Sequence, residues 1–112
     1  WRQAGEQGVG VIIMRGIAGG KLTRKFENLQ DENAREGIRG FLQYANQEAE
    51  GDPLVALAVR FVLAEPAVSS VILGSRRIEN IKANIEAARE LLPEDVVQKI
   101  RQHSRSISSK PW

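Results

Sequence analysis

Cysteine is absent from the 112 residues, which excludes a disulfide framework and a thiolate metal site. Long hydrophobic runs are absent too, because the longest, VGVIIM and VSSVIL, are far shorter than the roughly 20 residues needed to span a bilayer. The opening stretch, WRQAGEQ, has no basic region followed by an apolar one, and it does not begin with Met. We therefore expect no membrane segment and take the cytoplasm as the default compartment.

An excess of one charge is also lacking. Sixteen Lys and Arg residues stand against fourteen Asp and Glu, which gives a net charge of +2, and the two signs are interspersed along most of the chain. Nucleic-acid binding would need Lys and Arg clustered on one face, so we predict no such partner. The basic tail KIRQHSRSISSKPW, residues 99–112, is interpreted as a frayed and solvated end.

The composition is that of an ordinary globular protein. Hydrophobic residues make up 42% of the chain and charged residues 27%, which argues against disorder throughout. The length fits one domain, since independent domains cluster at roughly 100 to 150 residues. Residues 1–112 are therefore expected to form a single domain or a fragment of a larger one.

Two short apolar runs predict strands. The runs GVGVIIM (8–14) and VSSVIL (68–73) show little polar alternation, which is typical of strands buried on both faces of a parallel sheet. Between them lie a glycine-rich segment and two helical patterns, one near 32–49 and one over 53–65 with Asp52 as its N-cap. This order predicts an α/β fold in which helices connect parallel strands.

Two more helices are expected after the second strand. The segment 77–92 repeats apolar residues at helical spacing, and Pro93 both ends it and can open another helix, whose apolar contacts would come from Val96, Val97 and Ile100. The stripe predicted along the first of these helices consists of Ile78, Ile81, Ile85, Ala88 and Leu92. Two strands alone would each leave one edge unpaired, so we expect the missing neighbours to come from elsewhere.

The turn after the second strand carries residues suited to a phosphate. Ser75 can donate a hydroxyl, Arg76 can pair with phosphate at two points, and the helix that follows offers free N–H groups and the positive end of its dipole. The alternative is an ordinary turn in which Ser75 caps the helix and the arginines are solvated. The residues alone favour this alternative, because short motifs often match by chance.

Longer stretches of the sequence resemble the aldo-keto reductases. GVGVIIMRGIAGGKLTRKF is similar to the seventh barrel strand of that family and its glycine-rich loop. DPLVALAVRFVLAEPAVSSVILGSRRIENIKANI is similar to the seventh helix, the eighth strand and the phosphate-gripping turn, and AARELLPEDVVQKI to the closing helices. The resemblance covers nearly the whole chain but only the C-terminal third of a family member. It implies a partial TIM (β/α)8 barrel with about two parallel strands and four to five helices.

The resemblance also implies positions that bind NADPH. The matching residues are Met14, Arg15, Ile17, Gly19, Gly20, Lys21, Gly74, Ser75, Arg76, Asn80 and Asn84. The first would lie against the nicotinamide and the next two along the pyrophosphate and ribose. The following three would form the bend that lets the backbone approach the cofactor, and the next three would contact the adenosine 2′-phosphate. Asn84 would face the adenine, and Asn80 stands where relatives have Arg or Gln. The sequence departs from the family where Gly16 replaces a common proline and Ala83 replaces a frequent glutamate.

Members of the family reduce aldehydes and ketones with NADPH, but their catalytic residues lie on earlier strands. Tyr44 and His103 match none of these, so we predict no catalytic residue and no metal site, with His103 at the surface. We expect the isolated chain to be inactive, to bind cofactor weakly or not at all, and to need the missing N-terminal barrel portion. The alternative is a free-standing structural or binding module that self-associates through open strand edges. A weaker possibility is a homo-oligomer that rebuilds a cleft with a new activity.

Overall fold

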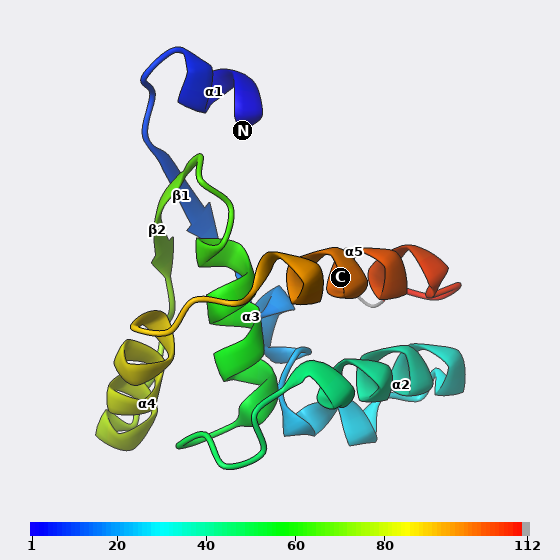
Figure 1. Cartoon of the computed structure of the whole chain (residues 1–112). Helices are drawn as coiled ribbons and strands as arrows, with labels where there is room; N and C mark the ends of the chain where they lie inside the picture. The colour runs from blue at the N-terminus through cyan, green and yellow to red at the C-terminus, as the bar shows by residue number, and fades with distance from the viewer. Residues whose placement is uncertain (111–112) are drawn as a thin grey trace.

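The computed structural model describes residues 1–110, which form two strands, five α-helices and three short 3-10 helices (Figure 1). In chain order these are α1 (Arg2–Glu6), β1 (Val11–Met14), η1 (Ala18–Gly20), η2 (Arg24–Asn28), α2 (Glu32–Arg39), η3 (Gly40–Tyr44), α3 (Pro53–Leu63), β2 (Val68–Ile72), α4 (Ile78–Ala88) and α5 (Glu94–Ser106). The predicted order of strand, loop, two helices, strand and two helices is confirmed. No helix within residues 1–110 has the length and apolar character needed to cross a bilayer.

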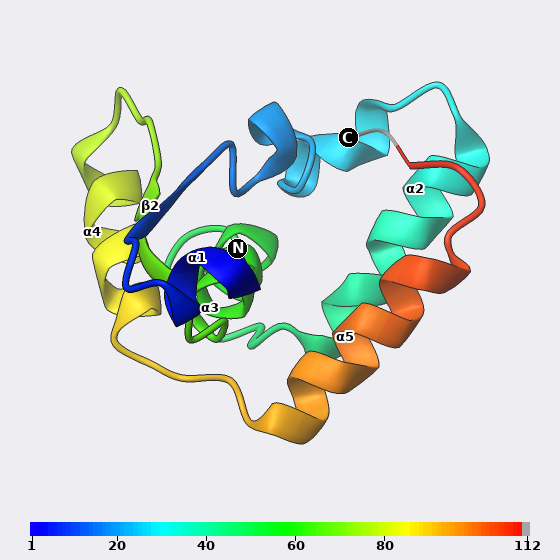
Figure 2. The same cartoon turned by 90° about the horizontal axis from the view of Figure 1, so that it is seen from above.

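The two strands lie side by side and run parallel. Met14 pairs with Ile72 at the carboxyl ends, and an irregularity between Val11 and Ile12 shifts the register near the start. Helix α3 connects the strands and packs against β2. Figure 2, seen from above, shows α3 in the middle, with α4 on one side and α2 and α5 on the other.

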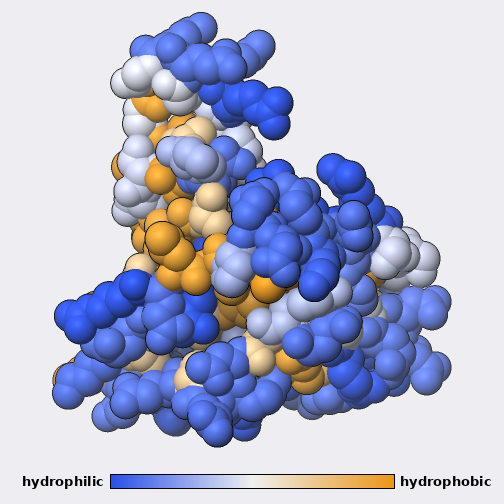
Figure 3. All heavy atoms as spheres, viewed as in Figure 1, coloured by the Kyte–Doolittle hydropathy of each residue, from blue (hydrophilic) through white to orange (hydrophobic). Residues whose placement is uncertain are grey.

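The prediction that both faces of the strands are buried is wrong. Ile12, Met14 and Ile72 are 60%, 73% and 58% exposed, whereas their neighbours Val11 and Ile13 are partly covered. The reason is that side chains alternate across a strand, and residues 1–110 provide a helical layer for one face only. Figure 3 shows the hydrophobic side chains that gather over the two strands as a result.

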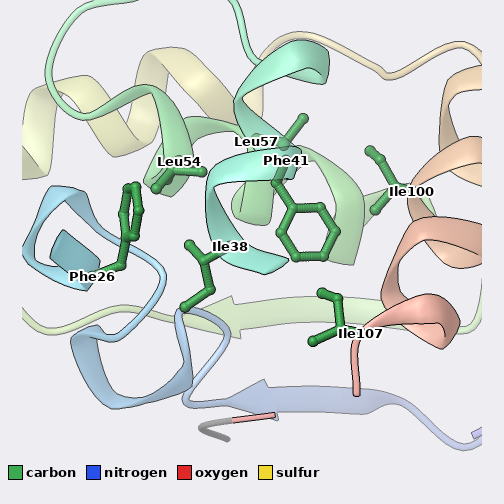
Figure 4. Packing of buried hydrophobic residues seen from close by; sticks show 7 residues of the cluster. All are labelled: Phe26, Ile38, Phe41, Leu54, Leu57, Ile100 and Ile107. Carbon is green, nitrogen blue, oxygen red and sulfur yellow. The ribbon is translucent and has the colours of Figure 1, made fainter. Parts of the chain in front are cut away.

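The main core lies away from the sheet, among the helical segments. Its seven buried side chains come from η2, α2, η3, α3 and the C-terminal segment (Figure 4): Phe26, Ile38, Phe41, Leu54, Leu57, Ile100 and Ile107. A smaller cluster of Ala56, Val59 and Ala87 joins α3 to α4. Helix α3 therefore takes part in both clusters and links the strands to the rest of the molecule.

The start of α3 is fixed by the N-cap that the sequence predicts. The Asp52 carboxylate accepts a hydrogen bond from the backbone N–H of Leu54 at 3.0 Å, and Pro53 occupies the first turn. Its second oxygen accepts a bond of 2.7 Å from the backbone N–H of Arg24, at the start of η2. One side chain thus joins a helix N-terminus to the segment that carries Phe26.

We predict that Asp52→Ala lowers the free energy of unfolding by about 1–2 kcal/mol, because two backbone N–H groups lose their acceptor. Urea denaturation followed by circular dichroism measures the change. Asp95→Ala is the control, since Asp95 lies in the first turn of α5 and only approaches Lys99 at 3.5 Å, an exposed pair worth about 0.5 kcal/mol or less. Equal effects of the two substitutions would contradict the capping role.

The predicted helix near 32–49 is shorter than expected. Helix α2 ends at Arg39, the 3-10 helix η3 continues to Tyr44, and Ala45 is extended. Helix α5 lies close to this segment, and a Cβ on Gly40 would stand 2.3 Å from an atom of the His103 imidazole. A Cβ on Gly37 would likewise stand 2.7 Å from Ile107, so the two glycines of this segment are the places where α2 and η3 meet the C-terminal segment.

The C-terminal segment is not frayed, so the interpretation of residues 99–112 is wrong for the part that is described. Helix α5 continues to Ser106, and Ile107 is buried in the main core. The Ser109 hydroxyl donates to the Asp31 carboxylate, and this bond is the main reason why the pKa of Asp31 is lowered. Residues 111–112, which belong to the same predicted tail, lie outside the described residues.

His103 is half-buried rather than at the surface. Its ring meets Phe41 edge-on with 4.7 Å between centroids, and its Nε2 lies 2.8 Å from the carbonyl oxygen of Gly37. The Tyr44 ring also meets the His103 ring edge-on, with 6.3 Å between centroids. These contacts join α5 to α2 and η3, so they give His103 a packing role.

The apolar stripe predicted along the helix after β2 is not the side of the helix that is buried. Helix α4 ends at Ala88 and buries Ala83 and Ala87, while Ile78, Ile81 and Ile85 remain exposed. Leu92 lies beyond the helix and packs against the main core. Small residues face α3 because the two helices approach closely along this side.

Candidate nucleotide-binding edge

The two segments that carry the predicted cofactor residues begin at one edge of the sheet. Because the strands are parallel and Met14 is paired with Ile72, the loop from Arg15 and the turn from Gly74 both leave the carboxyl edge. In α/β folds this edge is where ligands bind. The register of two strands that are more than fifty residues apart therefore brings the two segments together.

The loop after β1 has an unusual backbone. Arg15 and Ala18 have positive φ angles of 59° and 51°, and Gly19 and Gly20 follow with 64° and 91°. Left-handed conformations cost a residue with a Cβ about 1–2 kcal/mol, and such strain tends to accumulate at functional sites. The Thr23 hydroxyl donates to the Gly20 carbonyl at 2.7 Å and helps to hold this conformation.

The remaining predicted residues of this loop are placed as follows. Ile17 is half-buried, and its carbonyl oxygen accepts bonds from the N–H groups of Gly20 and Leu22. The Arg15 side chain folds over Gly19, where an added Cβ would lie 2.9 Å from Nη2. Lys21 is exposed. The space beside Gly19 is thus occupied by an arginine side chain of the same loop.

The turn after β2 is held by its serine. Ser75 Oγ accepts a bond from the backbone N–H of Arg77 at 3.2 Å and lies 3.3 Å from the Arg77 carbonyl oxygen, to which it donates. The N-cap of α4 is Arg77, and no side chain caps the helix. The alternative in which Ser75 caps α4 is therefore wrong, and the first-turn N–H groups of α4 keep their capacity to bind an anion.

The arginines of this turn are solvent-exposed. Neither the Arg76 nor the Arg77 guanidinium makes a hydrogen bond or ion pair among residues 1–110, and no atom other than those of its chain neighbours lies within 4 Å of a Cβ built on Gly74. Asn80 is exposed and Asn84 half-buried, one turn apart on α4. The sequence interpretation left Arg77 out, although the arginine doublet directly before the helix was the signal that could have included it.

A groove of about 380 Å³ lies beside the first loop but not at the second. Five of its twelve lining residues are apolar residues of α3, and the loop after β1 contributes Arg15, Gly16 and Ala18. Met14, Ser75 and Arg76 do not line it. The loop after β1 and the turn after β2 thus share the carboxyl edge of the sheet, whereas Asn80 and Asn84 lie along α4. Among the predicted cofactor residues, only Arg15 lines this groove.

The described residues form part of a parallel α/β barrel. The fold matches the aldo-keto reductase AKR11C1 from Bacillus halodurans in its apo form, with a TM-score of 0.71 and 24% identity over 92% of this chain and 37% of that chain. The holo form gives a TM-score of 0.70 over 91% of this chain and 36% of that chain, also at 24% identity. The predicted partial (β/α)8 barrel is confirmed.

Sequence comparison identifies the family. The model of the Aldo/keto reductase family matches residues 2–105, so the chain belongs to this family. The chain is also 28% identical to the "Uncharacterized oxidoreductase YqkF" of Bacillus subtilis (strain 168), over 89% of its own length. It spans only 36% of that relative. The chain therefore corresponds to about a third of an aldo-keto reductase.

Proposed function

We propose that this chain provides the part of an NADPH-dependent aldo-keto reductase that grips the phosphates of the cofactor. The observation that carries the proposal is the pairing of Met14 with Ile72, which makes the strained loop and the arginine-bearing turn leave one edge. In the proposed complex the 2′-phosphate of NADPH lies at the first turn of α4, against Ser75 and Arg76. The holo form of AKR11C1 supports a cofactor for the family.

The residues of this chain would contribute to cofactor binding and not to the chemical step of carbonyl reduction. The Ser75 hydroxyl holds the turn, the first-turn N–H groups of α4 offer donors, and Arg76 supplies charge. Met14, exposed at the strand end, offers an apolar, polarizable surface for the nicotinamide. Reduction of an aldehyde or ketone would need a proton donor, and His103 Nε2 is already engaged with the Gly37 carbonyl. We therefore propose that the isolated chain has no carbonyl-reductase turnover.

We predict that the isolated chain binds NADPH weakly and more tightly than NADH, and that Arg76→Ala removes most of this difference. Loss of a charge-assisted bond to phosphate corresponds to a fall in NADPH affinity of about tenfold or more. Calorimetric or fluorescence titration measures both nucleotides. Arg105→Ala is the control, because Arg105 is an exposed arginine in the last turn of α5. Equal affinity for NADPH and NADH in the unmodified chain would contradict the proposed phosphate site.

A further inference from the structure

The chain contains a single methionine and no cysteine, so Met14 Sδ is its only sulfur atom. Thioethers and thiols are the groups that hydroperoxides oxidise most readily, and the rate follows their exposure. Met14 is 73% exposed, whereas most methionines lie in protein interiors. A hydroperoxide therefore has one preferred target in this chain, and the target is open to solvent.

Met14 lies at the carboxyl edge of the sheet, among other exposed apolar residues. It is the last residue of β1 and is paired with Ile72, the last residue of β2. Paired residues of neighbouring strands point to the same face, and so do residues two apart along one strand. Ile72 and Ile12, which are 58% and 60% exposed, therefore share the uncovered face of the sheet with Met14. Figure 3 shows the hydrophobic side chains over the two strands. The only sulfur atom thus lies in an apolar patch at the edge where ligands bind in α/β folds.

The place of Met14 in the packing shows what its oxidation would change. Met14 belongs to neither of the two buried clusters. A sulfoxide in a core disrupts packing, but an oxygen on Met14 would project into solvent, so the fold would be kept. The patch itself would become polar, and an apolar ring that covers the sulfoxide would have to remove its hydrating water. Oxidation would therefore weaken binding at this patch without unfolding the chain.

We propose that Met14 is an oxidation site, and that its sulfoxide lowers the affinity of the chain for the nicotinamide end of NADPH. Hydrogen peroxide transfers one oxygen atom to Met14 Sδ. An S–O bond forms as the O–O bond breaks, the thioether loses two electrons to the peroxide, and the second oxygen leaves as water with both hydrogen atoms. The site of oxidation depends only on the sequence and the fold, whereas its effect on the cofactor rests on the function proposed above.

The test combines mass spectrometry with nucleotide titration, before and after the folded chain is treated with dilute hydrogen peroxide. We expect a mass gain of about 16 Da that peptide mapping places on Met14, and an unchanged circular dichroism spectrum. The affinity for NADPH should fall about threefold or more. Adenosine 2′,5′-bisphosphate carries no nicotinamide, so its affinity should not change. Saturating NADPH should in turn slow the oxidation of Met14.

Two variants separate the effect of this thioether from general oxidation. Met14→Leu has no sulfur, so peroxide should leave the NADPH affinity of this variant at its own untreated value. Met14→Leu combined with Leu91→Met places the only thioether at a residue that is 80% exposed and lies beyond α4, where oxidation should not alter the affinity.

The proposal is overturned if Met14 resists peroxide that oxidises the double variant, or if the oxidised chain binds NADPH as tightly as the untreated one. An untreated chain that binds no NADPH would instead refute the proposed function and, with it, the effect on the cofactor. The mass gain would still decide whether Met14 is the oxidation site.

Discussion

Phe26→Ala is expected to leave most of the isolated chain unfolded at room temperature. Phe26 is only 2% exposed and lies in the main core with Ile38 and Leu54. Replacing a buried phenylalanine by alanine lowers the free energy of unfolding by about 3–5 kcal/mol, because apolar burial is lost and a cavity remains. Small domains have total stabilities of about 5 kcal/mol or somewhat more, and this chain leaves one face of its sheet uncovered. The loss is therefore comparable with the whole stability.

Urea denaturation followed by far-ultraviolet circular dichroism measures the effect. Phe26→Leu keeps most of the side-chain volume and should lower the stability by less than about 1.5 kcal/mol. Leu91→Ala is the control for a large apolar residue that is 80% exposed, and it should change little. A loss below about 1 kcal/mol for Phe26→Ala would show that the core of Figure 4 does not hold the chain together.

Gly40→Ala is expected to destabilise the chain by about 1–3 kcal/mol, although alanine favours a helix. Gly40 has an ordinary helical backbone, with φ −58°, so propensity alone predicts a gain of about 1 kcal/mol. The new Cβ, however, would lie 2.3 and 2.4 Å from two atoms of the His103 ring. That ring cannot move without losing its contacts with Phe41 and with the Gly37 carbonyl.

Two further variants separate this clash from other effects of the substitution. Gly74→Ala is the matched control, because no atom lies within 4 Å of a Cβ at that position and its stability effect should be small. His103→Ala removes the ring, so adding Gly40→Ala to it should restore the gain that helix propensity predicts. Additive losses in the double variant would contradict a direct contact between the two residues.

The parts of the fold that were predicted correctly have local causes. Asp52 followed by Pro53 specifies a helix start through one carboxylate and one fixed φ angle, and both act within two residues. The two apolar runs predicted strands, and the helices between them predicted parallel pairing, because antiparallel neighbours need only a short turn. In each case the sequence contains the whole physical cause.

The parts that were predicted wrongly depend on which neighbour is present. The pattern of α4 gives the spacing of Ile78, Ile81 and Ile85 but not the side on which α3 lies, and α3 packs on the alanines instead. The strands were predicted as buried because their composition is that of a complete barrel, whereas residues 1–110 cover one face only. The segment in which α2 ends packs against His103, which is distant in the sequence.

The features of the candidate site also fall into those that the sequence predicted and those that it did not. Strand ends and the Gly74–Arg76 turn were visible in the sequence, and their common edge follows from parallel pairing. The left-handed conformation of Arg15 and Ala18 has no local signal, because residues with a Cβ rarely adopt it. Ser75 likewise accepts a bond from the Arg77 N–H instead of capping α4. This difference follows from the geometry of the turn, which the spacing of the residues in the sequence does not specify.

An NMR titration of the backbone amides with adenosine 2′,5′-bisphosphate tests the phosphate-gripping edge most directly, since it detects weak binding and locates it. We predict shifts at Gly74–Ile78 and in the loop 15–21, with much smaller shifts for adenosine 5′-monophosphate, which lacks the 2′-phosphate. Shifts confined to the apolar groove at Leu54 and Phe61, or no shifts at millimolar ligand, would contradict the proposed edge.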